Sequence, residues 1–272
     1  MLPIRDDNPT RRTPFVNWLL IAACAYVYFA VQPAGDPEST SFLVEQATIP
    51  CEVVTGDPVT LPEFRLDQCS SAPGESIFPD KSILFSLVAS IFLHGSIGHL
   101  LGNLWVLYIF GNNIEDELGH VPYTVFYLAS GLVASFAHIV LNPGSVVPVV
   151  GASGAIAGVM GAYLVLHPSA RVTSIVPPFF FWPFAVPAFV FLGIWFLGQF
   201  GLAGEDTNIA WEAHVGGFVF GLVVALWLRG HRRRRRQALE RADWDPYGYA
   251  PSHGPTDVRS RGRARGDWRR SR

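Results

Sequence analysis

The residues best suited to chemistry in this sequence are one serine and one histidine. Ser153 lies among small residues, between Gly151 and Gly154, and His214 precedes a pair of glycines. A serine hydroxyl becomes a nucleophile when a base such as histidine lies within hydrogen-bond reach. Ser153 and His214 therefore form a candidate pair for nucleophilic catalysis.

Three more polar residues precede this pair with the spacing His94-x4-His99-x3-Asn103. Residues four apart share one face of a helix, so His99 and Asn103 should point the same way. Acyl transfer forms a tetrahedral oxyanion, which needs hydrogen-bond donors held in place. His99, Asn103 and free backbone N–H groups near Gly151 could supply these donors, with His94 in support. No acidic residue is placed to orient His214, so we expect a Ser-His dyad.

These residues also have structural interpretations. The small residues around Ser153 and after His214 recur at helix-packing spacing, and such patterns commonly serve close helix contact alone. They are Gly154, Ala157, Gly158, Gly161, Gly217 and Gly221. The histidines could instead bind a metal, but the sequence has no H-E-x-x-H motif and no carboxylate beside the cluster. We therefore expect no metal and no cofactor.

The elements that must position these residues are membrane-spanning helices. Of the 272 residues, 50% are hydrophobic and only 15% are charged, a balance typical of a polytopic membrane protein. The apolar runs predict an all-α fold, a bundle of six transmembrane helices with a short central fourth helix. The expected spans cover residues 15–31, 97–110, 122–141, 153–166, 179–200 and 210–228.

The fourth span should be too short to cross the membrane. Its 14 or so residues reach about 21 Å at 1.5 Å per residue, against a hydrocarbon core of about 30 Å. Irregular backbone before Ser153 would then lie at membrane depth, where it is tolerated only inside protein or beside a wet cavity. Because spans two, four and six begin on the same side, His99, Ser153 and His214 should share one depth.

The charge distribution predicts the topology. Arginines flank the first and last expected spans, and by the positive-inside bias they make that side cytoplasmic. We therefore divide the chain into a cytoplasmic segment 1–14, a membrane domain 15–228 with an external loop 33–81, and a basic, disordered cytoplasmic tail 229–272. The expected location is a bacterial cell membrane. The arginines should anchor the chain at the lipid bilayer, and we expect no nucleic-acid partner.

The external loop contains Cys51 and Cys69. They form a disulfide if the loop faces an oxidising compartment, and they are free thiols otherwise. The sequence predicts no particular oligomeric state.

The three motifs, in this order and spacing, resemble the rhomboid intramembrane serine proteases over roughly residues 15–228. The resemblance implies that Ser153 is the nucleophile, that His214 is the general base, and that His99, Asn103 and the Ser153 N–H bind the oxyanion. It also implies that the substrates are transmembrane segments of other proteins, cleaved near the outer membrane face. Many bacterial members carry an aromatic residue where this chain has Ala157, so another group must hold the His214 ring.

Two other functions compete with proteolysis. A six-span transporter would show internal repeats or paired broken helices, and this sequence has one short span. A catalytically inactive rhomboid-like binding protein would lack the serine or the histidine, and this sequence retains both.

Overall fold

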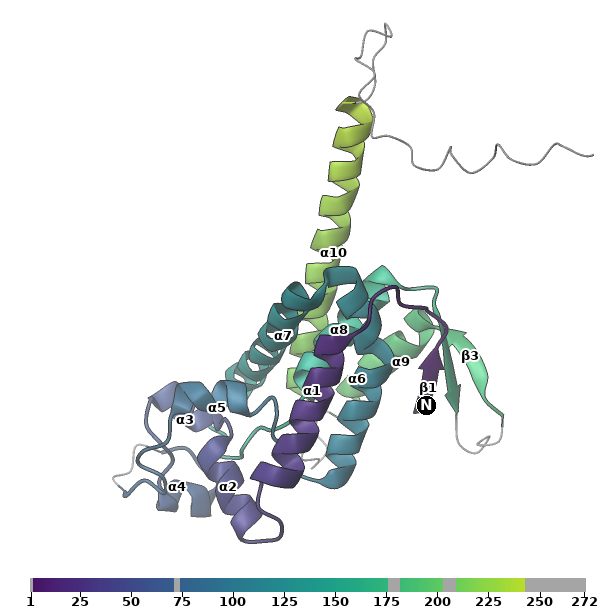
Figure 1. Cartoon of the computed structure of the whole chain (residues 1–272). Helices are drawn as coiled ribbons and strands as arrows, with labels where there is room; N and C mark the ends of the chain where they lie inside the picture. Colours follow the sequence, from purple (N-terminus) through teal and green to yellow (C-terminus); the bar gives the residue numbers. More distant parts are fainter. Residues whose placement is uncertain (1, 71–73, 176–181, 203–208, 243–272) are drawn as a thin grey trace, which may run out of the picture. The chain divides into compact units, whose positions relative to one another are not determined.

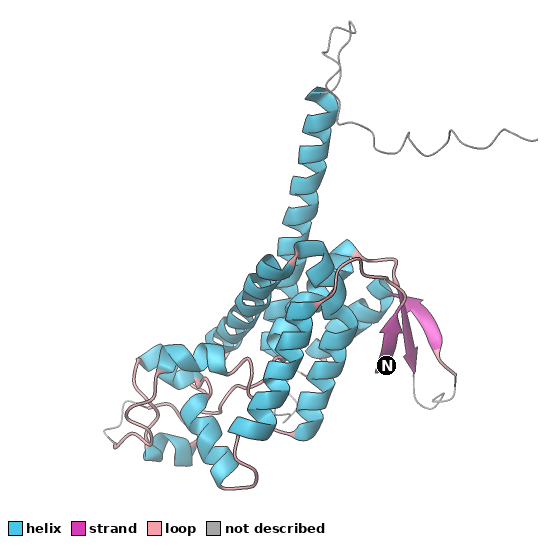
Figure 2. Cartoon of the chain, viewed as in Figure 1, coloured by secondary structure: helices cyan, strands magenta, loops and turns pink. Residues whose placement is uncertain are grey.

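The computed structural model describes residues 2–70, 74–175, 182–202 and 209–242, most of which are helical (Figures 1 and 2). The chain divides into two compact units, Met1–Arg229 and Gly230–Arg272, and the first contains the residues discussed above. The longer helices of the described residues are α1 (Phe15–Tyr26, continued by the π-helix η1, Val27–Val31), α6 (Ile97–Leu118), α7 (His120–Leu141), α8 (Ser153–Leu166), α9 (Ala188–Phe200) and α10 (Trp211–Ala242).

Two of these helices are long and apolar enough to cross a membrane by length and composition, and they cover His120–Leu141 and Trp211–Arg235. Phe15–Val31, Ser153–Leu166 and Ala188–Phe200 are shorter apolar helices. The structure is therefore mostly helical, as expected, while the count of six spans stays a prediction.

Helix α8 lies at the centre of the helical unit, as expected, and its 14 residues match the predicted length. It packs against α6, α7 and α9, and nearly all of its side chains are buried. A helix that is apolar on every face is stable only when neighbours surround it. This explains why α8, with its buried side chains, is almost entirely apolar after its first residue, Ser153.

Glycines let α8 and α10 approach to backbone contact. A Cβ on Gly217 would overlap the Gly154 carbonyl oxygen, and a Cβ on Gly221 would lie 2.6 Å from the Gly158 carbonyl carbon. Because small residues permit such close helix contact, these two pairs fix how far α10 can slide along α8. The same register brings the start of α8 beside His214.

The prediction of an all-α fold is wrong in one region. Strands β1 (Leu2–Asp6), β2 (Arg171–Ile175) and β3 (Phe184–Pro187) form an antiparallel sheet in the order β1-β2-β3 (Figure 2). The expected fifth span started at residue 179, but α9 begins only at Ala188, because Phe184–Pro187 pairs with β2. Residues 179–181 of that expected span lie outside the described residues.

Two helices also extend further than expected. Helix α6 runs to Leu118, beyond the expected end of the second span at residue 110, and an acidic residue in this extension contacts another helix. Glu115 accepts hydrogen bonds from the backbone N–H groups of Val16 and Asn17 at 3.0 and 2.7 Å, which satisfies free donors in the first turn of α1. Helix α10 continues through the arginines to Ala242 instead of ending near residue 228, and residues 243–272 lie outside the described part.

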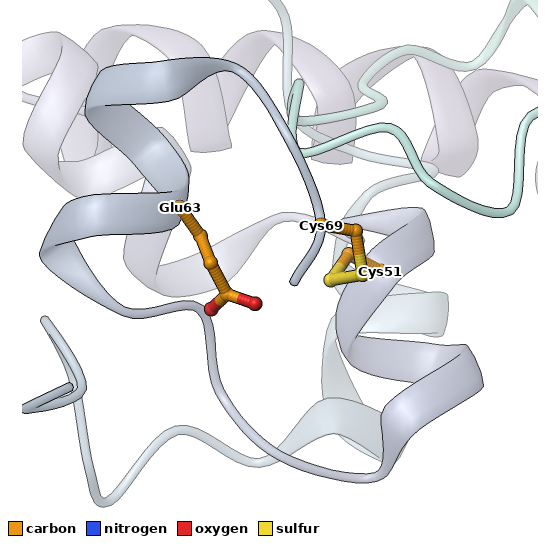
Figure 3. Close-up of side chains that lie close together, drawn as sticks. All are labelled: Cys51, Glu63 and Cys69. Atoms are coloured by element: carbon orange, nitrogen blue, oxygen red, sulfur yellow. A yellow bond between two sulfur atoms is a disulfide. The ribbon is translucent and has the colours of Figure 1, made fainter. Parts of the chain in front are cut away.

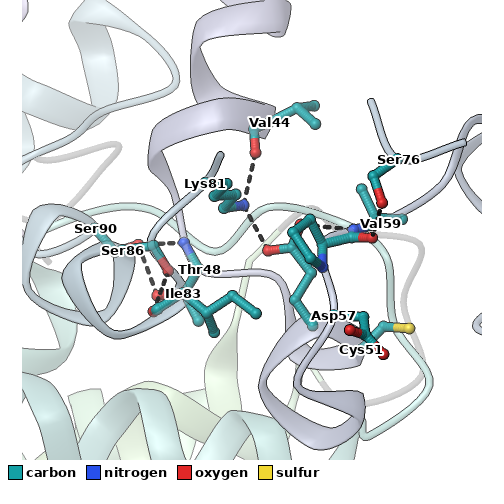
Figure 4. A network of polar contacts seen from close by, with 12 residues as sticks. Val44, Thr48, Cys51, Asp57, Val59, Ser76, Lys81, Ile83, Ser86 and Ser90 are labelled. Carbon is teal, nitrogen blue, oxygen red and sulfur yellow. Dashed lines mark hydrogen bonds and ion pairs between the residues drawn. The ribbon is translucent and has the colours of Figure 1, made fainter. Parts of the chain in front are cut away.

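The 33–81 loop contains the short helices α2 (Glu38–Gln46), α3 (Pro50–Thr55) and α4 (Leu61–Leu66), and α5 (Ile83–Ala89) follows it. Cys51 and Cys69 form a disulfide within it. Glu52 and Lys81 form an ion pair whose side chains are each 1% exposed, and Lys81 also donates to the Val44 carbonyl (Figure 4). Burial lowers the pKa of Lys81, and Glu52 partly offsets that shift. The loop is thus a folded unit with its own small core.

Candidate active site

Ser153 and His214 lie in direct hydrogen-bond contact. The Ser153 hydroxyl is 2.8 Å from His214 Nε2, and the two residues come from the first turns of α8 and α10. Both are partly exposed, in a helical unit whose centre is otherwise closely packed. The serine thus has a base within hydrogen-bond distance, and its partial exposure leaves it accessible to a reactant.

The backbone at Ser153 offers further donors. Helix α8 has no side-chain cap, and its first intrahelical hydrogen bond runs from the Ile156 N–H to the Ala152 carbonyl. The N–H groups of the first turn therefore have no intrahelical partner. They also lie at the positive end of the helix dipole, which favours negative charge.

His99, Asn103 and Gly151 lie together beside the serine. A Cβ on Gly151 would lie 2.6 Å from His99 Cε1 and 3.5 Å from Asn103 Nδ2. Gly151 also has a φ of 121°, a backbone conformation that residues other than glycine rarely adopt. Asn103 Nδ2 is buried without a hydrogen-bond partner, although buried donors are nearly always satisfied. This amide is therefore a donor held ready for an acceptor.

His94 supports this group from the turn between α5 and α6. Its ring lies 5.2 Å from the His99 ring, centroid to centroid, in an edge arrangement. The Gln32 side chain fixes its main chain by donating to the His94 carbonyl and accepting from the His94 N–H. His94 therefore limits the positions open to His99.

The segment 143–151 leads into the serine and is fixed by the 33–81 loop and by the residue after α5. The Val149 N–H donates to the Thr48 carbonyl at 2.8 Å, and the Gly151 N–H donates to the Ser90 carbonyl at 2.9 Å. The Cys51 N–H donates to the Ser145 carbonyl at 3.0 Å. The irregular backbone of this segment thus obtains hydrogen-bond partners inside the protein, from the loop and from Ser90.

Two residues on α9 complete the surroundings of His214, and neither was predicted. The Gln199 side-chain oxygen lies 2.7 Å from His214 Nδ1, and the Trp195 ring lies 6.0 Å from the imidazole ring, centroid to centroid. Trp195 thus places an aromatic ring beside the His214 ring, a contact that Ala157 cannot make. Gln199 could have been found in the sequence as a polar residue in an apolar run, since such residues are costly in a membrane and mark function.

A second polar cluster lies nearby but is separate from the serine. Glu212 accepts a hydrogen bond from the Asn142 side chain at 3.1 Å and lies 3.2 Å from His138 Nδ1. Glu212 contacts these residues and not the His214 ring, which agrees with the expectation that no acidic residue orients His214.

One group of side chains in the loop has the composition of a metal site. Cys51, Glu63 and Cys69 lie close together (Figure 3), but the two sulfurs are bonded to each other and carry no thiolate. Glu63 instead accepts hydrogen bonds from the Thr60 and Ser70 N–H groups, at 2.9 Å each. This group therefore stabilises the loop and does not bind a metal.

Comparison with known proteins bears on the family of this chain. Residues 81–231, more than half of the chain, match the Rhomboid domain model. The chain is 31% identical over 171 residues to "RHOMBOID-like protein 12, mitochondrial" of Arabidopsis thaliana, covering 56% of this chain and 48% of that protein. It is 33% identical over 105 residues to the human "Presenilin-associated rhomboid-like protein, mitochondrial", covering 38% and 28%. It is 28% identical over 171 residues to "Rhomboid protein 1, mitochondrial" of Saccharomyces cerevisiae, covering 57% and 46%.

The chain thus spans about half or less of the length of these relatives. Their names also overturn the expectation of a bacterial cell membrane with cytoplasmic termini, because all three are mitochondrial proteins of eukaryotes and point to a mitochondrial membrane. Because the Rhomboid domain model matches more than half of the chain, the chain belongs to the rhomboid family.

Proposed function

We propose that this protein is an intramembrane serine endopeptidase that cleaves transmembrane segments of other membrane proteins. The observation that carries the proposal is the 2.8 Å contact between the Ser153 hydroxyl and His214 Nε2 at the N-terminus of a buried helix. A packing role alone would require neither the histidine nor a free helix N-terminus at this point. Family membership supports the reaction class.

In the proposed reaction His214 Nε2 takes the Ser153 proton while the serine oxygen attacks the carbonyl carbon of the scissile peptide. The carbonyl oxygen becomes an oxyanion, which accepts hydrogen bonds from His99, Asn103 and the Ser153 N–H. The imidazolium of His214 then protonates the leaving amine, and the peptide C–N bond breaks. Water, deprotonated by His214, releases the acyl group from Ser153 and restores the enzyme.

The substrate must present an unwound segment. The peptide groups of an intact helix are hydrogen-bonded to one another, so their carbonyls are not open to attack. The partly exposed Ser153 and His214 limit attack to a strand-like stretch that can enter beside α8. We propose that this stretch comes from near the membrane face on which α8 begins.

A covalent probe and a single substitution test this function. Purified protein should react with a fluorophosphonate probe and cleave a model transmembrane substrate, and Ser153→Ala should abolish both. His138→Ala is the matched control for His214→Ala, because His138 contacts Glu212 and not the serine. His214→Ala should lose activity and His138→Ala should keep most of it. Cleavage that persists in Ser153→Ala would exclude the proposed nucleophile.

A further inference from the structure

The contact between α9 and His214 carries an inference about how the base is prepared for reaction. His214 uses both ring nitrogens: Nε2 lies 2.8 Å from the Ser153 hydroxyl and Nδ1 lies 2.7 Å from Gln199 Oε1. Neutral imidazole carries one proton, so one nitrogen donates and the other accepts. Only the tautomer protonated at Nδ1 leaves Nε2 free to take the serine proton.

The orientation of the Gln199 amide determines which tautomer is present. Its Nε2 donates to the Trp195 carbonyl at 3.1 Å, so Oε1 is the atom that faces His214 Nδ1. Turning the amide over would place Oε1 against the Trp195 carbonyl, and two oxygens without a proton between them repel. An amide oxygen only accepts. Gln199 therefore requires a proton on His214 Nδ1.

Gln199 is itself well fixed. Gln199 is 7% exposed, and it lies one turn after Trp195 on α9, so both residues face His214. The Trp195 ring is tilted by 38° to the imidazole ring and contacts Phe218 of α10 as well. Gln199 thus holds the imidazole by a hydrogen bond, and Trp195 holds it by contact between the two rings.

We propose that Gln199 is a positioning residue that holds His214 in the Nδ1–H tautomer and aims Nε2 at Ser153, with Trp195 fixing the ring plane. This inference rests on the proposed function and deepens it, because it replaces an isolated dyad with a base that is oriented by a neutral third partner. A neutral partner differs from a carboxylate in adding no charge beside the imidazolium that forms during reaction. The other titratable groups that act electrostatically on His214 are His99 and Glu212.

Two substitutions separate this role from simple packing. Gln199→Met keeps the length of the side chain and removes the acceptor, so we expect kcat to fall about 10- to 100-fold while KM is unchanged. Gln199→Glu restores an acceptor and adds a charge that stabilises the imidazolium. We therefore expect it to recover kcat at alkaline pH and to move the acid limb of the pH–kcat profile to higher pH.

Gln68→Met is the matched control, because Gln68 is exposed in the 33–81 loop, and it should leave kcat and the pH profile unchanged. Wild-type kcat in Gln199→Met would overturn the proposal. So would an equal loss in Gln199→Met and Gln199→Glu, with lowered thermal stability and no shift of the acid limb, because that result indicates packing alone.

A spectroscopic measurement tests the tautomer without any substitution at Gln199. In protein labelled with 15N-histidine, the His214 signals, assigned by their loss in His214→Ala, should show a protonated Nδ1 and an unprotonated Nε2 near pH 8. A protonated Nε2 in the wild type would refute the role of Gln199. If the wild type neither cleaves substrate nor reacts with fluorophosphonate, the proposed function fails instead, and the tautomer measurement still decides the inference.

Discussion

Substituting Gly221 with alanine should lower catalysis from a position that touches neither catalytic residue. A Cβ there would lie 2.6 Å from the carbonyl carbon and 2.8 Å from the Cα of Gly158, both backbone atoms that cannot rotate away. Carbon atoms in contact lie about 3.5 Å or more apart, so α10 has to move from α8 by about 1 Å. Overpacking of this kind costs about 1–3 kcal/mol of stability.

The same movement acts on the reaction, because Ser153 and His214 lie on the two helices that separate. A displacement of about 1 Å in the reacting groups can cost about 100-fold in rate. We therefore expect kcat of Gly221→Ala to fall between 10- and 100-fold at temperatures where the variant is folded, with a lower thermal unfolding midpoint. Cleavage of a model transmembrane substrate in detergent and unfolding followed by circular dichroism measure the two effects.

Gly193→Ala is the control, because Gly193 lies in α9 with nothing within 4 Å of an added Cβ. Alanine favours helix over glycine, so this variant should keep its activity and unfold at the same temperature or slightly higher. Wild-type stability and kcat in Gly221→Ala would refute the reasoning that backbone contact between α8 and α10 sets the distance from Ser153 to His214.

Three further predictions concern the oxyanion donor and the loop. Asn103→Ala should lower kcat about 100- to 1000-fold with little change in KM, as for loss of an oxyanion donor; a change in KM alone would contradict that role. Replacing Cys51 and Cys69 by alanine should lower loop stability by about 3 kcal/mol for their separation of 18 residues, and a reductant should lower the thermal midpoint of the wild type but not of this variant. Burial opposes ionisation of Glu63, but hydrogen bonds from Thr60 and the Ser70 N–H outweigh it and lower its pKa. The stabilisation by Glu63 is therefore complete above its unfolded-state pKa near 4.5 and is lost as pH falls through the lower folded-state value. Amide exchange in α4 should be faster in Glu63→Gln than in the wild type at pH 7, and the difference should shrink as pH falls below 4.5. A difference that stays constant with pH would contradict the assignment.

The place of Ser153 at the start of a short helix could be predicted from the sequence because it depends on local quantities. The length of α8 follows from the apolar run between Ser153 and His167, and helix rise per residue is nearly constant. Span order then places His99, Ser153 and His214 toward one side, and the structure brings Ser153 and His214 into contact. The spacing of His99 and Asn103 likewise places both beside Gly151.

The sheet and the partners of His214 could not be predicted in the same way. Strands β1 and β3 have 5 and 4 residues, too few for a periodic pattern, and β1 pairs with a strand far along the chain. Gln199 lies on α9, which begins only at Ala188 because the preceding residues form β3 and pair with β2. The position of Gln199 beside His214 therefore depends on the pairing of β2 with β3. The extension of α6 through its acidic residues could not be predicted either, because Glu115 accepts hydrogen bonds from α1, a contact that hydropathy does not encode.

The pairing of β1 with β2 also bears on the order in which the protein matures during synthesis. Leu2 pairs with Ile175, so the ribosome must add about 170 residues before the first strand finds its partner, on the order of 10 to 35 s at 5–20 residues per second. Helix α9 follows directly from β3, and α10 follows α9, so His214 and both of its α9 partners emerge after this sheet can close. The earlier helices can thus pack before His214 exists in the chain, and the contact between Ser153 and His214 forms only after this sheet can close.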